Sequence, residues 1–172
     1  MINPVQLKLA DASFIALALF YLIMLGGGNY EQLTITNLVT SAPPKSLYIL
    51  QGPHGFRPMA FWATFRPITI LLFIIALIMN WRHTGARRNL LLIAFGVDLL
   101  TTIATYTYFA PETGAIANAV YDPSIVDEIQ LQRAQLWKNL NWIRLAGFYL
   151  GGLLLLLALK QSSVQAKAVE SR

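Results

Sequence analysis

Residues 58–81 read PMAFWATFRPITILLFIIALIMNW, an apolar stretch with a single charged residue, Arg66. A helix needs about 20 apolar residues to cross the ~30 Å hydrocarbon core of a membrane, because each residue rises by about 1.5 Å. The stretch is long enough, and its apolar and polar residues do not alternate with a period of two. A helix is then the form that satisfies its backbone groups in lipid, so the stretch predicts a transmembrane helix.

Three further stretches have the same character. The sequence therefore predicts an all-α, four-helix transmembrane bundle in a single domain. We expect the first stretch to be a retained span rather than a cleaved signal peptide, because no A-x-A cleavage site follows it. The further stretches are Ala12–Tyr30, which is uncharged, Asn89–Phe109, which contains Asp98, and Asn139–Leu159, which contains Arg144. The predicted helices cover about 10–29, 58–81, 89–109 and 124–160, followed by a tail from 161 to 172.

The composition agrees with a chain surrounded by lipid. Hydrophobic residues make up 56% of the chain and charged residues 12%, whereas soluble domains carry about 25% charged residues. The net charge is +5, but the basic residues flank apolar stretches instead of forming one patch, so the predicted partner is a lipid bilayer and not nucleic acid. The chain has no cysteine, which excludes disulfides, thiolate metal sites and CxxC redox chemistry.

The connections predict the orientation. The connection 81–88 is short and basic, whereas 31–57 and 110–138 are long and of mixed charge. Because short basic loops stay in the cytoplasm, we expect 81–88 and both termini to be cytoplasmic, in a multi-pass protein of the plasma (inner) membrane. Prolines 43 and 44 and the turn cluster at 52–55 predict that the first long connection folds back on itself.

The fourth helix is expected to begin well before the membrane. Residues 122–124, Asp-Pro-Ser, are a helix-start signal, and Ser124 with Asp127 fits a capping box. No glycine or proline follows before Gly147. A helix from Ser124 to Lys160 would be about 55 Å long and would project beyond the outer face.

Three spans each hold one ionisable residue: Arg66, Asp98 and Arg144. Each costs about 2.5–3.5 kcal/mol at mid-membrane, so we expect all of them to face the bundle interior and to find partners. Asp98 should pair with one arginine, which leaves the other, Arg144, for a ligand. We expect Arg66, Asp98, Asn141 and Arg144 to form one connected network in the outer half of the bundle.

The polar residues of each span share a face. On the fourth helix, Arg133, Trp137, Asn141, Arg144 and Phe148 lie within about 80° at 100° per residue. Such a face combines a stacking surface, an amide and a fixed cation, which suits an anionic or carbonyl-bearing aromatic ligand. The other helices contribute Asp98, Thr101, Thr102 and Thr105 (third), Trp62 and Arg66 (second), and Asn29, Tyr30 and Glu31 (first).

Each of these features has a purely structural alternative. Asp98 and the threonines could only lock helices together, and Arg66 could extend outward to the interface. Gly147 and Gly151 form a small-xxx-small motif, for which close packing within the bundle is favoured over formation of a homo-oligomer. His54 and His83 are expected on opposite sides of the membrane, so no metal site is predicted.

Several short motifs together resemble one family. They are Gly27-Gly28-Asn29-Tyr30-Glu31, Pro43-Pro44-x-Ser46, Phe61-Trp62 with Pro67, Asn80-Trp81 with Arg87-Arg88, Tyr108-Phe109-x-Pro111 and Trp137-x3-Asn141-x2-Arg144. In these motifs, which extend over nearly the whole chain, the sequence resembles the anthrone oxygenase-like family of small four-helix membrane proteins.

The resemblance implies a cofactor-independent oxygenase that oxidises hydrophobic, anthrone-like aromatic substrates with dioxygen. Such a reaction needs a base, a cation for the enolate-like oxygen and a dry aromatic pocket. Asp98 or Glu31 would be the base, Arg144 and Asn141 would stabilise the anion, and Trp137 would stack on the substrate. Trp62, Arg66, Tyr30, Thr101 and Thr105 complete the expected binding site. The alternative is a non-catalytic membrane protein that recognises a small lipophilic ligand or a partner protein.

Overall fold

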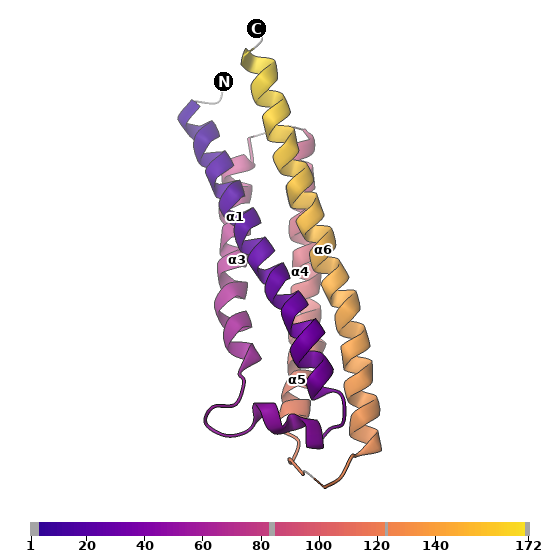
Figure 1. Cartoon of the computed structure of the whole chain (residues 1–172). Helices are drawn as coiled ribbons and strands as arrows, with labels where there is room; N and C mark the ends of the chain where they lie inside the picture. The colour runs from indigo at the N-terminus through magenta and orange to yellow at the C-terminus, as the bar shows by residue number, and fades with distance from the viewer. Residues whose placement is uncertain (1–3, 83–84, 123, 171–172) are drawn as a thin grey trace.

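The computed structural model describes residues 4–82, 85–122 and 124–170. These residues form an all-α bundle of long helices that run side by side (Figure 1). Within them, four helical stretches are long and apolar enough to cross a membrane, namely Gln6–Val39, Met59–Asn80, Ala86–Ala117 and Glu128–Gln161. The predicted four-helix bundle is confirmed, and the chain is a multi-pass membrane protein.

The first stretch is longer than expected. α1 (Pro4–Tyr30) continues without interruption through a π-helical segment, η1 (Glu31–Thr36), into the short α2 (Asn37–Val39). The expectation that a loop begins at residue 31 is therefore wrong. The helical winding continues as far as Val39, so Glu31 and the residues after it are held on a helix instead of a loop.

The third stretch is extended in the same way. α4 (Ala86–Ala104) passes through a second π-helical segment, η3 (Thr105–Phe109), into α5 (Ala110–Ala117), so a loop does not begin at residue 110. Pro111 does not end the helix, because it lies in the first turn of α5, directly after the change from π-helical to α-helical winding, and membrane helices accommodate a proline through such local changes of winding. Around η3, the Thr107 hydroxyl donates to the Ile103 carbonyl at 2.8 Å and the Thr113 hydroxyl to the Phe109 carbonyl at 2.7 Å.

α3 (Pro58–Asn80) agrees with the predicted second helix and includes Pro67 without a break. Before it, residues 40–57 fold back across the end of the bundle and include a short 3-10 helix, η2 (Lys45–Leu50). A backbone hydrogen bond from Phe56 N–H to the Ile49 carbonyl, 2.8 Å long, closes this turn. The prediction that the first long connection folds back is confirmed for this part.

α6 (Glu128–Glu170) is continuous, as predicted, but both predicted ends are wrong. It begins at Glu128, where Asp127 caps it by accepting hydrogen bonds from the N–H groups of Ile129 (2.9 Å) and Gln130 (3.2 Å). Ser124 instead donates its N–H (2.8 Å) and its hydroxyl (2.5 Å) to Asp122, and these bonds lower the pKa of the Asp122 carboxyl. Pro123 lies outside the described residues. The predicted tail is helical up to Glu170.

A contact with the first connection explains the later start of α6. Val126 pairs with Pro44 in an isolated antiparallel bridge, and the Asp127 N–H donates to the Pro43 carbonyl at 3.1 Å. These bonds hold residues just before Glu128 in an extended form, so the first turn of α6 forms only after them.

The two ends of the bundle differ. The beginning of α1, the end of α6, the end of α3 and the beginning of α4 lie at one end, which we call the short-loop end. The described parts of the two long connections lie at the other, the long-loop end (Figure 1). Between the helices, a core of large apolar side chains includes Phe14, Tyr21, Phe73, Leu91 and Phe148.

Close packing within the bundle accounts for the two glycines of α6. A Cβ atom on Gly147 would lie 2.6 Å from the Thr101 methyl group of α4, and one on Gly151 would overlap the hydroxyl of Tyr21 on α1. Tyr21 itself is fixed between the rings of Phe73 and Phe148, which both meet it edge-on. The two glycines thus let α6 approach α4 and α1, as the favoured interpretation of the motif predicts.

We expect Gly151→Ala to destabilise the bundle by about 1–3 kcal/mol, the usual cost of overpacking, because the buried Tyr21 ring cannot move aside. Gly96→Ala on α4 is the matched control, since a Cβ atom there meets nothing within 4 Å, and it should be neutral or slightly stabilising. Thermal unfolding in detergent micelles measures both. Equal unfolding midpoints for the two variants would contradict this account.

Candidate functional site

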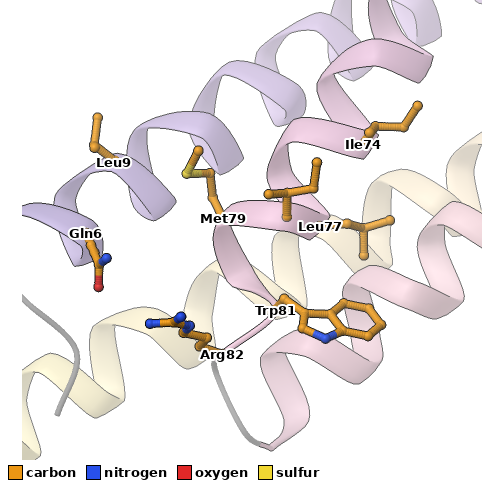
Figure 2. A pocket seen from close by; sticks show the side chains of 8 residues that line it. Gln6, Leu9, Ile74, Leu77, Met79, Trp81 and Arg82 are labelled. Carbon is orange, nitrogen blue, oxygen red and sulfur yellow. The ribbon is translucent and has the colours of Figure 1, made fainter.

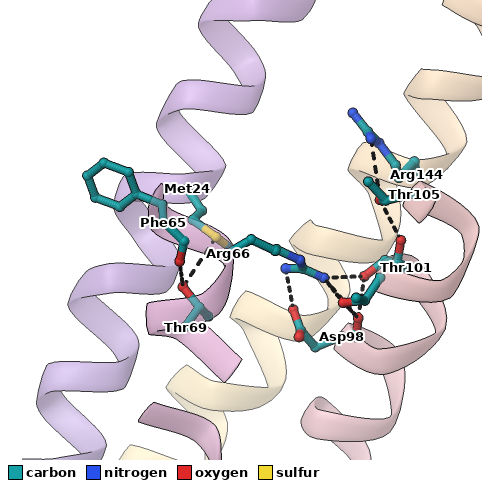
Figure 3. Close-up of polar contacts among 9 residues, drawn as sticks. Met24, Phe65, Arg66, Thr69, Asp98, Thr101, Thr105 and Arg144 are labelled. Carbon is teal, nitrogen blue, oxygen red and sulfur yellow. Dashed lines mark hydrogen bonds and ion pairs between the residues drawn. The ribbon is translucent and has the colours of Figure 1, made fainter. Parts of the chain in front are cut away.

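Arg66 and Asp98 form an ion pair inside the bundle (Figure 3). The Arg66 Nη1 atom lies 2.9 Å from Asp98 Oδ1, and the two side chains are 4% and 1% exposed. Arg66 Nη2 also donates to the Asp98 backbone carbonyl at 3.0 Å and to the hydroxyls of Thr101 (3.4 Å) and Thr102. The predicted pairing of Asp98 with one arginine is confirmed, and the threonines on its face take part in it.

Arg144 is the arginine that remains. Within the described residues, no carboxylate oxygen lies within 4 Å of its guanidinium group. Its Nη1 donates a long hydrogen bond, 3.4 Å, to the Thr105 hydroxyl, and its Cζ lies 4.6 Å from the centre of the Phe109 ring and 5.8 Å from that of Trp62. The prediction that one arginine is left without a carboxylate partner agrees with this geometry, and the ligand-binding role of Arg144 stays a prediction.

Thr105 links the two arginines. Its hydroxyl donates to the Thr101 carbonyl at 2.7 Å, and Thr101 is itself bonded to Arg66 and to the Asp98 carbonyl (Figure 3). A chain of hydrogen bonds therefore runs from the ion pair along α4 and η3 to Arg144. For Arg66, Asp98 and Arg144, the prediction of one connected network is correct.

Asn141 belongs to a different pair, which corrects that prediction. Its side-chain amide donates to Gln32 Oε1 at 2.5 Å, and Gln32 Nε2 donates to the Lys138 carbonyl at 3.1 Å. Gln32 is fully buried. The sequence pattern did not indicate Gln32, because a loop is predicted from residue 31 onward. Continuing the helical pattern by one turn would have found Gln32, since it lies four residues after Gly28 on the same face.

Glu31 lies beside these groups on η1. Its Oε2 accepts a 2.5 Å hydrogen bond from Trp62 Nε1, and it is close enough to Arg144 for an electrostatic attraction. Tyr30, the residue before it, is 61% exposed on the outside of the bundle. The structure therefore brings Glu31 and Trp62 to the site and leaves Tyr30 away from it.

A cavity of about 330 Å³ lies at the long-loop end, between η1, the first connection, α5 and α6, and we call it the long-loop cavity. Glu31 and the buried Trp137 line it, and Trp137 Nε1 donates to the Phe109 carbonyl at 3.4 Å. Arg57, which sequence analysis did not single out, lines it too. The other lining residues are Ile35, Thr36, Val39, Leu50, Phe56, Met59, Ala110, Thr113, Gly114, Ile116, Ala117 and Asn118.

The remaining predicted site residues do not line the long-loop cavity. Instead they form a polar layer next to it, deeper in the bundle, through the ion pair and the hydrogen bonds given above. These residues are Arg66, Asp98, Asn141, Arg144, Trp62, Thr101 and Thr105.

The two π-helical segments, η1 and η3, border this region from two sides. η1 carries Glu31 and Gln32, and η3 carries Thr105 and Phe109, which contact Arg144. Single π-helical turns inside α-helices occur frequently at functional sites, because they redirect side chains that an α-helix would point elsewhere. No sequence pattern predicted either segment.

The histidines and the other acidic groups add no further site. His54 is exposed in the first connection, and His83 lies outside the described residues. Among residues 4–82, 85–122 and 124–161, no three histidine, aspartate or glutamate side chains gather closely enough to hold a metal ion.

In comparisons with family models, with curated proteins and with solved structures, the chain has no significant match. The resemblance to the anthrone oxygenase-like family stays a prediction that rests on the motifs alone.

We expect Asp98→Asn to cost about 3–5 kcal/mol of stability, because it leaves the buried Arg66 charge without a counter-charge. The matched control is Glu112→Gln, which breaks the ion pair between Glu112 and Arg133. In that pair the Glu112 side chain is 20% exposed and the Arg133 side chain is 54% exposed. That change should cost less than about 1 kcal/mol.

Equilibrium unfolding in mixed micelles measures both variants. The double variant Arg66→Met with Asp98→Leu removes both charges and should recover most of the lost stability. If Asp98→Asn is no more harmful than Glu112→Gln, the ion pair is not the stabilising contact that its burial indicates.

Proposed function

We propose that the long-loop cavity binds a small, flat, hydrophobic molecule with a weakly acidic C–H group, and that Glu31 accepts a proton from it. The long-loop cavity is the observation behind this proposal, because it combines a carboxylate, aromatic side chains and apolar side chains in one partly open volume. At about 330 Å³, it is at the small end of the range of ligand pockets, roughly 300–1,000 Å³. The ligand is accordingly the size of a few fused rings.

Glu31 has the contacts that a general base needs. One oxygen is held by the indole N–H of Trp62, and no hydrogen bond to the other oxygen is present within the described residues. Arg144, which does not line the cavity, is close enough to attract the carboxylate electrostatically. Asp98, the other predicted base, is enclosed by Arg66, so the proposal assigns the base to Glu31.

As the resemblance implies, the proposed reaction is oxidation by dioxygen. Glu31 takes a proton from the methylene carbon of an anthrone, and the carbanion is delocalised onto the carbonyl oxygen. Arg57 supplies a cation in the cavity wall for that oxygen. The carbon then adds dioxygen to form a peroxide anion, which takes the proton back from Glu31 to become a hydroperoxide. The hydroperoxide loses water to leave the second carbonyl, so CH₂ and O₂ become C=O and H₂O.

One observation favours the alternative, a binding protein without catalysis. Arg144 and Asn141, which were expected to stabilise the anion, do not line the cavity. Turnover therefore depends on Arg57, a side chain at the outer edge of the cavity. If Arg57 cannot reach the ligand, the same pocket would bind a lipophilic molecule and leave it unchanged.

Purified protein in nanodiscs with anthrone and dioxygen tests the proposal. Glu31→Gln should retain binding, measured by quenching of tryptophan fluorescence, and lose turnover by at least about 100-fold, the usual contribution of a general base. Arg144→Lys should retain part of the activity and Arg144→Ala less, because the lysine keeps the charge but not the planar group. Oxygen uptake and anthraquinone absorbance measure turnover.

Glu112→Gln is the control for this series, since Glu112 is an acidic residue at the same end that does not line the cavity. Binding without turnover in the unchanged protein would favour the binding protein. If the unchanged protein does not bind anthrone, the proposed ligand class is wrong.

We also propose that the chain lies in the plasma (inner) membrane with the short-loop end in the cytoplasm, because Arg82, Arg87 and Arg88 cluster at that end. The chain has no cysteine, so single-cysteine variants need no background correction. In intact cells, an impermeant maleimide should label Lys45→Cys and not Ala86→Cys. Labelling of Ala86→Cys from outside would invert the orientation.

A further inference from the structure

A groove of about 540 Å³ lies at the short-loop end and shares no lining residue with the long-loop cavity. Figure 2 shows it from close by. It runs between the beginning of α1 and the end of α3. Its walls are the side chains Leu9, Ile74, Leu77, Ile78 and Met79, and its remaining lining residues are Gln6, Trp81 and Arg82.

The groove opens toward the surrounding membrane. Ile78 is 64% exposed and Leu9 is 53% exposed, although both belong to helices apolar enough to span a membrane. Apolar side chains in such positions contact lipid chains. The groove is therefore a place where one lipid chain can lie between two helices instead of along a flat surface.

The polar end of the groove carries a free cation. Of the three arginines between residues 82 and 88, Arg87 is paired with Asp11 at 2.7 Å, and Arg88 lies over the Trp81 ring and donates to the Trp81 carbonyl at 3.5 Å. Within the described residues, Arg82 has no hydrogen bond or ion pair. Figure 2 shows its guanidinium group between Gln6 and Trp81.

We propose that this groove is a binding site for one anionic phospholipid. An acyl chain fills the apolar part, and the phosphate group binds the Arg82 guanidinium group, with the amide of Gln6 as a second donor. Trp81 lies at the level where indole rings are usually found in membranes, between the chains and the head groups. The uncompensated positive charge selects a net negative head group over a zwitterionic one. This site does not depend on the proposed function of the long-loop cavity.

Native mass spectrometry of the protein with phosphatidylglycerol and phosphatidylcholine of identical chains tests the site. We expect one tightly bound phosphatidylglycerol and weaker binding of phosphatidylcholine. Arg82→Gln should weaken phosphatidylglycerol binding about fivefold, the equivalent of one basic side chain at an anionic membrane surface. Lys45→Gln removes an exposed positive charge at the opposite end and should leave the affinity unchanged.

A second pair of variants tests the groove independently of charge. Ile78→Trp fills the groove and should displace the bound lipid, whereas Leu100→Trp, at a 68% exposed position on α4 outside the groove, should not. Equal affinity for the two lipids, or unchanged binding in Arg82→Gln, would overturn the head-group assignment. Retention of the lipid in Ile78→Trp would overturn the groove.

Discussion

The guanidinium group of Arg66 and the carboxylate of Asp98 meet at 2.9 Å between α3 and α4, in an interior that is otherwise largely apolar. Neither charge is tolerable alone at that depth, because an unpaired ion in a low-dielectric interior costs several kcal/mol. The pair therefore fixes how α3 and α4 face each other. Thr101 and Thr102 follow on the next turn of α4 and supply further oxygens for the guanidinium group. The interpretation of the threonines as groups that lock helices together agrees with these bonds.

This pairing also determines what is left for chemistry. Because Asp98 neutralises Arg66, Arg144 has no carboxylate partner within the part of the chain that the structure describes. Its neighbours are the rings of Phe109 and Trp62 and the more distant Glu31. A cation held mainly by aromatic faces still exerts a field on nearby groups. The role proposed for Arg144 is accordingly to act through Glu31, not on a ligand directly.

The π-helical segments connect this polar layer to the long-loop cavity. In η1, the change of winding allows Glu31 to face the cavity while Gln32, the next residue, is buried against Asn141. In η3, it places the Thr105 hydroxyl toward Arg144 and the Phe109 ring beside it. Backbone carbonyls freed by such turns cannot remain unpaired in a membrane. Threonine hydroxyls donate to carbonyls one turn earlier along this segment, which gives those carbonyls a further hydrogen bond.

The sequence alone was sufficient for the features that depend on local composition and on the cost of a charge in lipid. Apolar length determined the four spans, and the need to neutralise Asp98 predicted both its pairing with an arginine and an arginine left over. Tertiary structure decided the rest. The bridge between Pro44 and Val126 moved the start of α6 to Glu128, and the π-helical turns moved Glu31 and Gln32 from an expected loop onto a helix. The first connection folded over the bundle end and brought Arg57 to the cavity wall. These features depend on contacts between residues far apart in the chain, and such contacts leave no periodic signal in the segments that make them.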